Sequence, residues 1–185
     1  SARICLTEDK FSNPMQPPNF CMLMRKHIQG GRITAIRQQD SERIIEIDIE
    51  AQTELGFTTS KRLIVEIMGK HSNIILVDIE SGKIIDAIKR ISIDVNRYRQ
   101  LLPGVIYVYP PKQDKTPFKS ASTEDFVNSE GVVLSEKLIM NRISGISPAI
   151  ARELLSSKNP AARLAEIAES AETGPFTPTI YFDED

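Results

Sequence analysis

The segment PPNFCMLMRKHIQGGRI, Pro17 to Ile33, decides the fold of this chain. Residues 20, 23, 24, 27 and 28, which are apolar except for His27, fall at helical spacing on one face, and this predicts a helix with one buried face. Asn19 is expected to cap that helix through its side-chain oxygen. Gly30 and Gly31 are expected to end it, because glycine adopts the left-handed conformation without steric cost. A strand follows from Ile33, so the segment predicts a helix packed beside a sheet.

Segments beyond this one alternate between apolar and polar residues with the two-residue period of half-buried strands. The alternation runs through 43–50 and 62–67, whereas 74–77 is continuously apolar, as in a more central strand. A turn at 80–83 precedes another strand, 84–88. Short strands are also expected at the two ends of this region, at Arg3–Leu6 and at Tyr107–Tyr109. Together these segments predict an α+β fold with a mostly antiparallel sheet and one packed helix.

The chain after residue 120 has the pattern of an all-helical lobe. Apolar residues fall at helical spacing from 134 to 143, and Ser147-Pro148 is a cap followed by a favoured first helical residue. Asn159-Pro160 is expected to begin a last helix, which should end near residue 171. We therefore predict a sheet lobe over 1–120, a helical lobe over 121–172 and a C-terminal tail over 173–185. Within the tail, 180–182 has the sequence of a short strand.

Composition is that of an ordinary globular protein. The 185 residues are 41% hydrophobic and 26% charged. No apolar run approaches the roughly 20 residues that span a bilayer, and no signal peptide is visible. The two cysteines, Cys5 and Cys21, form no CxxC pair. Reduced thiols in a cytoplasmic protein that has no membrane partner are the simplest interpretation.

The small net charge of -2 conceals an asymmetry along the chain. Residues 1–120 contain 18 Lys and Arg against 14 Asp and Glu, whereas residues 121–185 contain 5 against 11. The first part is thus +4 and could offer a basic face to a polyanion, although ordinary surface scatter explains the same count.

Enzyme chemistry has little support in the sequence. Two histidines and two cysteines do not form a metal cluster at ligand spacing, so we expect no metal and no cofactor. No nucleophile elbow, P-loop or dinucleotide fingerprint stands in a strand–turn–helix context, so we expect no catalytic residues. His27 falls on the apolar face of the predicted helix, where a core histidine is more usual than a catalytic one.

Three segments in order resemble the N-terminal domain of the NFACT family. They are the opening segment 17–33, RLIVEIMGKHSNIILVD at 62–78, and NRYRQLLPGVIYVYPP at 96–111. The resemblance implies a fold similar to the N-terminal domain of formamidopyrimidine-DNA glycosylases. Those enzymes act through an N-terminal proline, whereas this chain begins Ser1-Ala2, so that activity is not carried over. Since full-length members carry further N-terminal sequence, a coiled coil and a C-terminal RNA-binding domain, we expect an N-terminally truncated, excised piece.

The same resemblance implies a function in ribosome-associated quality control. Its members bind obstructed large ribosomal subunits that carry peptidyl-tRNA, and they recruit tRNA, of the alanine type in typical bacteria, for C-terminal tailing of stalled chains. The implied location is the cytoplasm, on the ribosome. The alternative, taken from the older family name, is a surface adhesin that binds fibronectin at the cell surface. A signal peptide in the full-length gene would favour the alternative.

Glu42 and Arg43 match the acidic-arginine pair that the family uses for tRNA-dependent tailing. The family commonly has Asp at the first position, so Glu42 departs conservatively. Locally the pair is equally well explained as two solvated charges at a strand start. The remaining candidate contacts with RNA or the ribosome are cations or histidine inside the matching segments: Arg25, Lys26, Lys70, His71, Arg97 and Arg99.

The sequence ISGIS, Ile143 to Ser147, resembles the turn of a helix-hairpin-helix. In that motif a Gly-hydrophobic-Gly turn presents backbone N–H groups to a nucleic-acid phosphate. Here Ser147 replaces the second glycine, and the surrounding lobe is acidic. We therefore expect a helical hairpin whose role is mainly structural, with phosphate binding left open.

Overall fold

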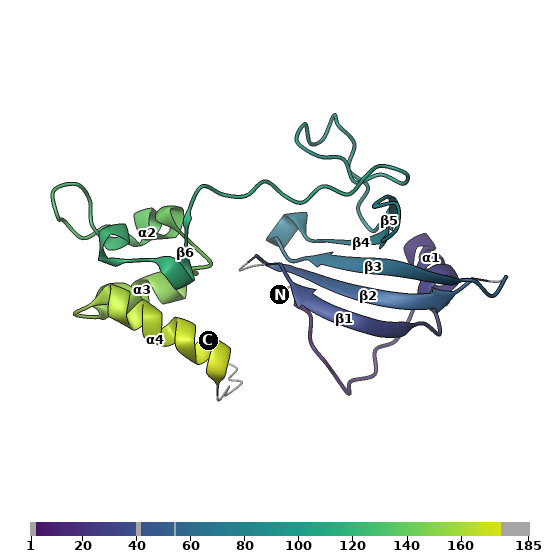
Figure 1. Ribbon diagram of the computed structural model, residues 1–185, viewed down its shortest axis with the longest axis horizontal. Helices are drawn as coiled ribbons and strands as arrows, with labels where there is room; N and C mark the ends of the chain where they lie inside the picture. The colour runs from purple at the N-terminus through teal and green to yellow at the C-terminus, as the bar shows by residue number, and fades with distance from the viewer. Residues whose placement is uncertain (1–2, 40–41, 54, 175–185) are drawn as a thin grey trace. The chain divides into compact units, whose positions relative to one another are not determined.

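The computed structural model describes residues 3–39, 42–53 and 55–174 (Figure 1). The contacts divide the chain into two units, Ser1–Pro111 and Lys112–Asp185. The contacts therefore place residues 112–120 with the second unit, whereas the sequence predicted them in the sheet lobe.

The first unit is built on a five-stranded antiparallel sheet with neighbours in sequence order, β1-β2-β3-β4-β5. The strands are β1 (Arg32–Gln38), β2 (Ile44–Gln52), β3 (Thr58–Glu66), β4 (Asn73–Asp78) and β5 (Ile84–Ala87). The predicted antiparallel α+β fold is confirmed. The continuously apolar segment is β4, which has buried residues on both faces, as expected for an interior strand.

One helix, α1 (Asn19–Ile28), packs on this sheet, mainly against β2 and β5 (Figure 1). The residues predicted to face the sheet are all half-buried, so the helical spacing was interpreted correctly. The predicted cap was wrong, because Pro18 occupies the N-cap position and Asn19 is already the first helical residue. The proline fixes the extended backbone that precedes the first turn, so no side-chain cap is made.

Two of the predicted strands are absent. The segment Arg3–Leu6 is exposed and pairs with no strand among the residues that the structure describes, so it forms no ladder there. Tyr107–Tyr109 makes one backbone bond, from the Tyr107 N–H to the Gly82 carbonyl (3.0 Å), and its tyrosine hydroxyls bond to carboxylates on the sheet. Because Pro110 and Pro111 follow at once, no longer ladder can form there.

The segment from Ile88 to Pro111 covers one face of the sheet, and we call it the strap. It is bonded to the start of β5, where the Ile84 N–H donates to the Val105 carbonyl (2.8 Å) and the Ile84 carbonyl accepts from the Gly104 N–H (2.8 Å). Leu101 of the strap is fully buried in the main apolar core of this unit. The other buried members of that core come from four strands of the sheet: Ile44, Ile64, Ile75, Val77, Ile84 and Ala87.

The second unit is mostly helical. Its elements are β6 (Thr116–Pro117), η2 (Phe118–Ser120), η3 (Thr123–Phe126), α2 (Glu136–Arg142), β7 (Ile143–Ser144), α3 (Pro148–Ser156) and α4 (Pro160–Thr173). Ser147 and Asn159 cap α3 and α4 as predicted, accepting from the N–H groups of Ile150 (3.2 Å) and Ala162 (3.1 Å). The parallel pair β6 and β7 means that this unit is not entirely helical. The short strand predicted at 180–182 lies outside the described residues.

Replacing Gly145 with alanine is expected to destabilise the second unit by about 2 kcal/mol. Gly145 has φ +80°, which costs a residue with a Cβ about 1–2 kcal/mol, and the added Cβ would lie 2.9 Å from Cδ1 of Phe118. Gly131→Ala is the matched control, because its φ is +77° but nothing lies within 4 Å of the added Cβ. Urea unfolding followed by circular dichroism should rank the two variants in that order. Equal losses would show that contact with Phe118 contributes nothing.

Candidate nucleic-acid interface

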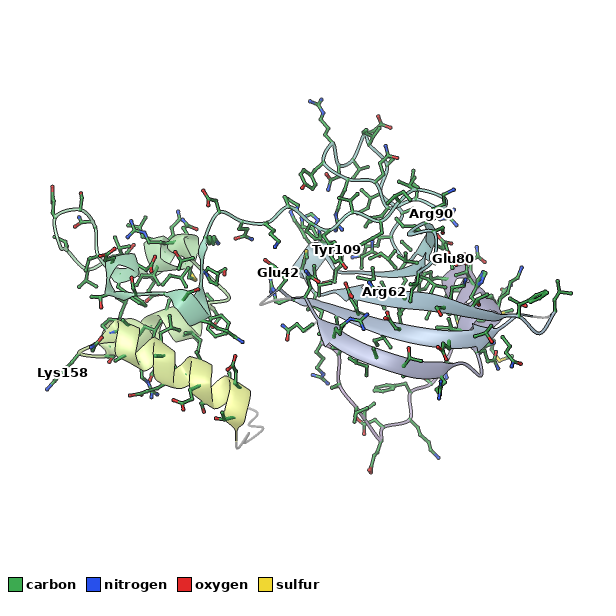
Figure 2. The ribbon with its side chains drawn as sticks, viewed as in Figure 1. Glu42, Arg62, Glu80, Arg90, Tyr109 and Lys158 are labelled. Atoms are coloured by element: carbon green, nitrogen blue, oxygen red, sulfur yellow. The ribbon has the colours of Figure 1, made fainter. Side chains whose placement is uncertain are left out.

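The start of β2, the end of β3 and the start of β4 lie at one end of the sheet, which we call the Arg43 end. The antiparallel register pairs Ile44 with Glu66 and Glu66 with Asn73, and so fixes this arrangement. Arg43 is exposed and Glu42, labelled in Figure 2, is half-buried. The Arg43 carbonyl accepts from the Ile67 N–H (2.8 Å), so the backbone under the predicted pair is tied to β3.

The 3₁₀ helix η1 (Gly69–His71) joins β3 to β4 at the same end. The His71 N–H donates to the Met68 carbonyl (3.1 Å), and the Ser72 hydroxyl accepts from the Met68 N–H (3.0 Å). Lys70 and His71 are exposed. Two predicted contacts from the second matching segment are thus brought to the end of the sheet that carries Arg43.

Sequence reasoning missed Lys89, which the fold adds to the Arg43 end. Its Nζ donates to the Lys70 carbonyl (3.1 Å), while Asn73 bonds both to its N–H (2.9 Å) and to its carbonyl (2.8 Å). Lys89 directly follows the predicted strand 84–88, the observed β5, whose end lies beside the start of β4 in the antiparallel sheet. The order of the strands was therefore a usable signal, although no motif marks the residue.

Arg99 is buried and does not face solvent in this structure. Its guanidinium forms two parallel bonds with the Glu66 carboxylate, at 2.7 and 2.6 Å, and a third with the Val108 carbonyl at 3.1 Å. The Tyr107 hydroxyl donates to the same carboxylate (2.8 Å). Burial acts to lower the pKa of Arg99, but the bonds to Glu66 leave that pKa raised. Arg99 therefore fastens the strap to the Arg43 end and is not placed to contact a ligand.

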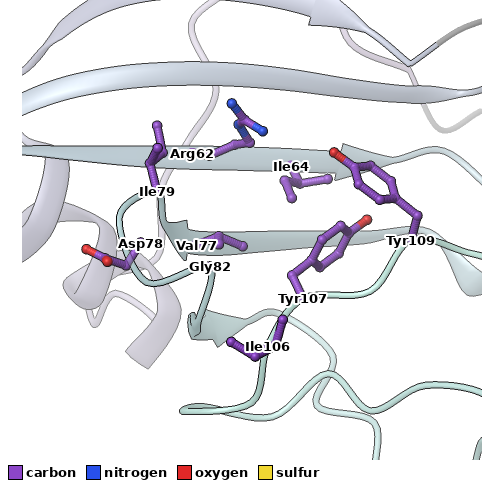
Figure 3. Close-up of a pocket in the computed structure, with 9 residues that line it drawn as sticks. All are labelled: Arg62, Ile64, Val77, Asp78, Ile79, Gly82, Ile106, Tyr107 and Tyr109. Atoms are coloured by element: carbon purple, nitrogen blue, oxygen red, sulfur yellow. The ribbon is translucent and has the colours of Figure 1, made fainter.

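A second charged group lies along the same face, away from the Arg43 end. Arg62 binds Asp48 through two nitrogens (2.7 and 3.1 Å) and lies 3.3 Å from Glu46, to which the Tyr109 hydroxyl also donates. The bonds from Arg62 lower the pKa of Asp48. Beside it lies a shallow pocket of about 180 Å³ between Arg62, Tyr107, Tyr109 and apolar side chains of β4 and the strap (Figure 3). The charges pair with one another across β2 and β3, and the bond from Tyr109 to Glu46 ties the strap to β2.

The other predicted contacts do not join the Arg43 end as one cluster. Arg25 and Lys26 are exposed on α1, which leads into the start of β1 and so lies toward the opposite end of the sheet (Figure 1). His27 is half-buried against the sheet, and burial followed by the nearby charges of Lys61 and Lys26 lowers its pKa. Arg97 is exposed on the strap, two residues from the buried Arg99.

Within residues 3–39, 42–53 and 55–174, no group of three or more His, Cys, Asp or Glu side chains could hold a metal ion. In the same described part, no helix is both long and apolar enough to cross a membrane.

Comparison with known sequences gives a consistent group of matches. A family model described as NFACT N-terminal and middle domains matches residues 1–184. The Rqc2 homolog RqcH of Bacillus subtilis (strain 168) is 44% identical over 156 residues, which cover 82% of this chain and 27% of that protein. The archaeal homolog aRqcH of Methanocaldococcus jannaschii is 24% identical over 158 residues, covering 82% and 22%. The chain thus spans about a quarter of the length of these relatives.

Solved structures match the fold as well. The N-terminal part of the fibronectin/fibrinogen-binding protein from Streptococcus suis superimposes with a TM-score of 0.75 at 36% identity, covering 88% of this chain and 62% of that one. The N-terminal domain of the fibronectin-binding protein PavA from Streptococcus pneumoniae gives 0.71 at 38% identity, covering 91% and 61%. The arrangement of strands and helices described above is therefore shared with experimentally determined domains.

Proposed function

This chain belongs to the NFACT family, and we propose that it is an RNA-binding module of a ribosome quality-control factor. The observation that carries the proposal is the gathering of Arg43, Lys70 and Lys89 at one end of a rigid sheet. Three cations on fixed backbone suit the phosphates of RNA, and an arginine fork can clasp one phosphate through two nitrogens. The relatives named RqcH support the assignment to quality control.

The finer part of the proposal concerns tRNA. Glu42 and Arg43 are consecutive residues where the loop enters β2, the first half-buried and the second exposed. In this proposal both contact the same tRNA. A carboxylate can accept from a base amine while the arginine holds a phosphate or stacks on a base. The pair would then recruit a tRNA, of the alanine type, to an obstructed large subunit. The ribosome would supply the chemistry of C-terminal tailing, and this module would act without catalysis of its own.

Fibronectin binding is the second candidate, because two solved neighbours carry fibronectin or fibrinogen in their names. The names describe those proteins, and the described residues of this chain offer no separate feature that favours an extracellular ligand. Immobilised fibronectin is therefore included in the experiment as a competing ligand.

The double variant Glu42→Ala/Arg43→Ala is expected to bind tRNA about tenfold more weakly, because one bidentate phosphate contact and one base contact are lost. Removing one phosphate contact should also reduce the salt slope by about 1. Fluorescence anisotropy with labelled deacylated tRNA at several KCl concentrations measures both. In cells that carry the gene, the same variant should leave stalled chains untailed.

The control is Glu153→Ala/Arg163→Ala, an exposed acid–arginine pair in the second unit with the same net change of charge. Each double variant should unfold within about 0.5 kcal/mol of wild type, because all four side chains lie outside the buried core, with Glu42 half-buried. If Glu42 and Arg43 can both be removed with tRNA affinity and tailing unchanged, the site is misassigned. If the chain binds fibronectin but not tRNA, the second candidate replaces the first.

A further inference from the structure

The tip of the strap is a closed loop of nine residues, 92–100. Ile91 and Leu101 close it by donating to each other's carbonyls, at 3.1 and 2.8 Å. Inside the loop, the Asn96 side-chain oxygen accepts from the N–H groups of Tyr98 (2.9 Å) and Arg99 (3.4 Å). The buried Arg99–Glu66 pair then fastens the loop to the sheet. The loop is thus held at its base, along its backbone and through one buried side chain.

This loop exposes large apolar side chains. Tyr98 is 60% exposed, and Ile93 and Val95 are exposed beside it in sequence. Within the part of the chain that the structure describes, the Tyr98 hydroxyl has no hydrogen-bond partner, whereas those of Tyr107 and Tyr109 both bind carboxylates. Tyr98 is outside the buried core, and its neighbours Ile93 and Val95 are exposed on the same anchored loop. Apolar side chains exposed together, unlike single ones, commonly mark a contact with another molecule.

The anchor places the loop beside the cations of the Arg43 end. Glu66 binds Arg99 through its side chain. In the β2–β3 register Glu66 lies opposite Ile44, the residue after Arg43. It also pairs with Asn73, which binds Lys89. Within the loop, Asp94 is the one acidic residue against Arg97 and the paired Arg99. Because Arg99 is neutralised by Glu66, Asp94 and Arg97 balance each other within the loop, and the excess positive charge comes from the exposed Arg43, Lys70 and Lys89 of the neighbouring Arg43 end. That excess favours a polyanion over a neutral or basic peptide.

We infer that Tyr98 is a stacking surface for an unpaired RNA base whose neighbouring phosphates are held at the Arg43 end. The inference rests on the proposed function and specifies which RNA the same site takes. Proteins that read single-stranded RNA combine a basic track for the backbone with aromatic rings on which bases stack. A duplex keeps its base faces stacked inside, so its phosphates would reach the cations but its bases would not reach Tyr98.

The test compares two labelled RNAs of twelve nucleotides by fluorescence anisotropy: an all-adenosine strand and an abasic strand with the same phosphates. The whole chain is used, as wild type, Tyr98→Ala and Tyr98→Phe. Phe57→Ala is the matched control, because Phe57 is also an exposed aromatic (68%) but lies in the β2–β3 connection at the opposite end of the sheet. Far-ultraviolet circular dichroism checks that each variant is folded.

Tyr98→Ala is expected to bind the adenosine strand about tenfold more weakly, because one stacked base is lost. Its affinity for the abasic strand should not change. Tyr98→Phe and Phe57→Ala should both behave as wild type. Arg43→Ala should weaken binding of both strands, because it removes a phosphate contact.

The other outcomes separate the two proposals. If wild type binds the adenosine strand and Tyr98→Ala binds it equally well, the stacking role is wrong and the proposed function stands. If Tyr98→Ala weakens both strands to the same extent, the ring acts on the loop or the phosphates, and the stacking role is again overturned. If wild type binds neither strand nor tRNA, both proposals fail together.

Discussion

Replacing Arg99 with alanine is expected to lower the free energy of unfolding of the first unit by about 3–5 kcal/mol. Glu66 is 1% exposed, and the substitution would leave its carboxylate buried without its cation. The Tyr107 hydroxyl would remain as a donor but cannot neutralise the charge. The strap should then detach from the sheet, and the apolar core under Leu101 should open to water.

Tyrosine fluorescence during urea unfolding reports this change, because three of the four tyrosines, at positions 98, 107 and 109, lie in the strap and the chain has no tryptophan. Arg97→Ala is the control, since it removes the same charge from an exposed position two residues away. It should change stability by no more than about 0.5 kcal/mol. The double variant Glu66→Leu/Arg99→Met should recover most of the loss, because neither charge stays buried alone. A single variant no more costly than Arg97→Ala would contradict the anchoring role.

The sheet was predictable because its signals are local. Alternation through 43–50 and 62–67 gave β2 and most of β3, and the turn at 80–83 gave the return into β5. The predictions that failed depend on the rest of the molecule. Arg3–Leu6 has a strand-like sequence but no strand beside it in the described part of the chain. Tyr107–Tyr109 is positioned by bonds to Glu66 and Glu46, on strands far away in sequence. Alternation in sequence cannot show whether a partner is present.

The candidate site was predictable in part for the same reason. The predicted strands and the family-like segments include or adjoin Arg43, Lys70 and His71. The antiparallel connections then bring these three residues to one end of the sheet. Arg99 looks like its neighbour Arg97 in the sequence, yet its partner Glu66 lies 33 residues earlier. Only the folded structure shows that Arg99 is buried against Glu66, whereas Arg97 is exposed to solvent.

Replacing Gly31 with alanine is expected to destabilise the first unit by about 3 kcal/mol, near the upper end of the usual cost of overpacking. Its backbone is not in the left-handed region, so conformational freedom is not what requires glycine. The added Cβ would lie 2.8 Å from the Glu50 carbonyl oxygen, 2.8 Å from Cγ2 of Ile49 and 3.0 Å from the Ile28 carbonyl oxygen. Two of these three atoms are backbone, which cannot turn aside as a side chain can. Relief requires α1 to move off β2.

Gly30→Ala is a demanding control. If glycine were needed in this pair only for its positive φ, Gly30→Ala would destabilise the first unit more than Gly31→Ala. Gly30 has φ +74° and open space around the added Cβ, so its cost is only the backbone strain, about 1 kcal/mol. Urea unfolding of both variants should therefore show the larger loss at the glycine with ordinary dihedral angles. If Gly30→Ala costs more, the pair acts mainly by ending the helix. If Gly31→Ala costs more, glycine is needed there because α1 and β2 approach more closely than a Cβ allows.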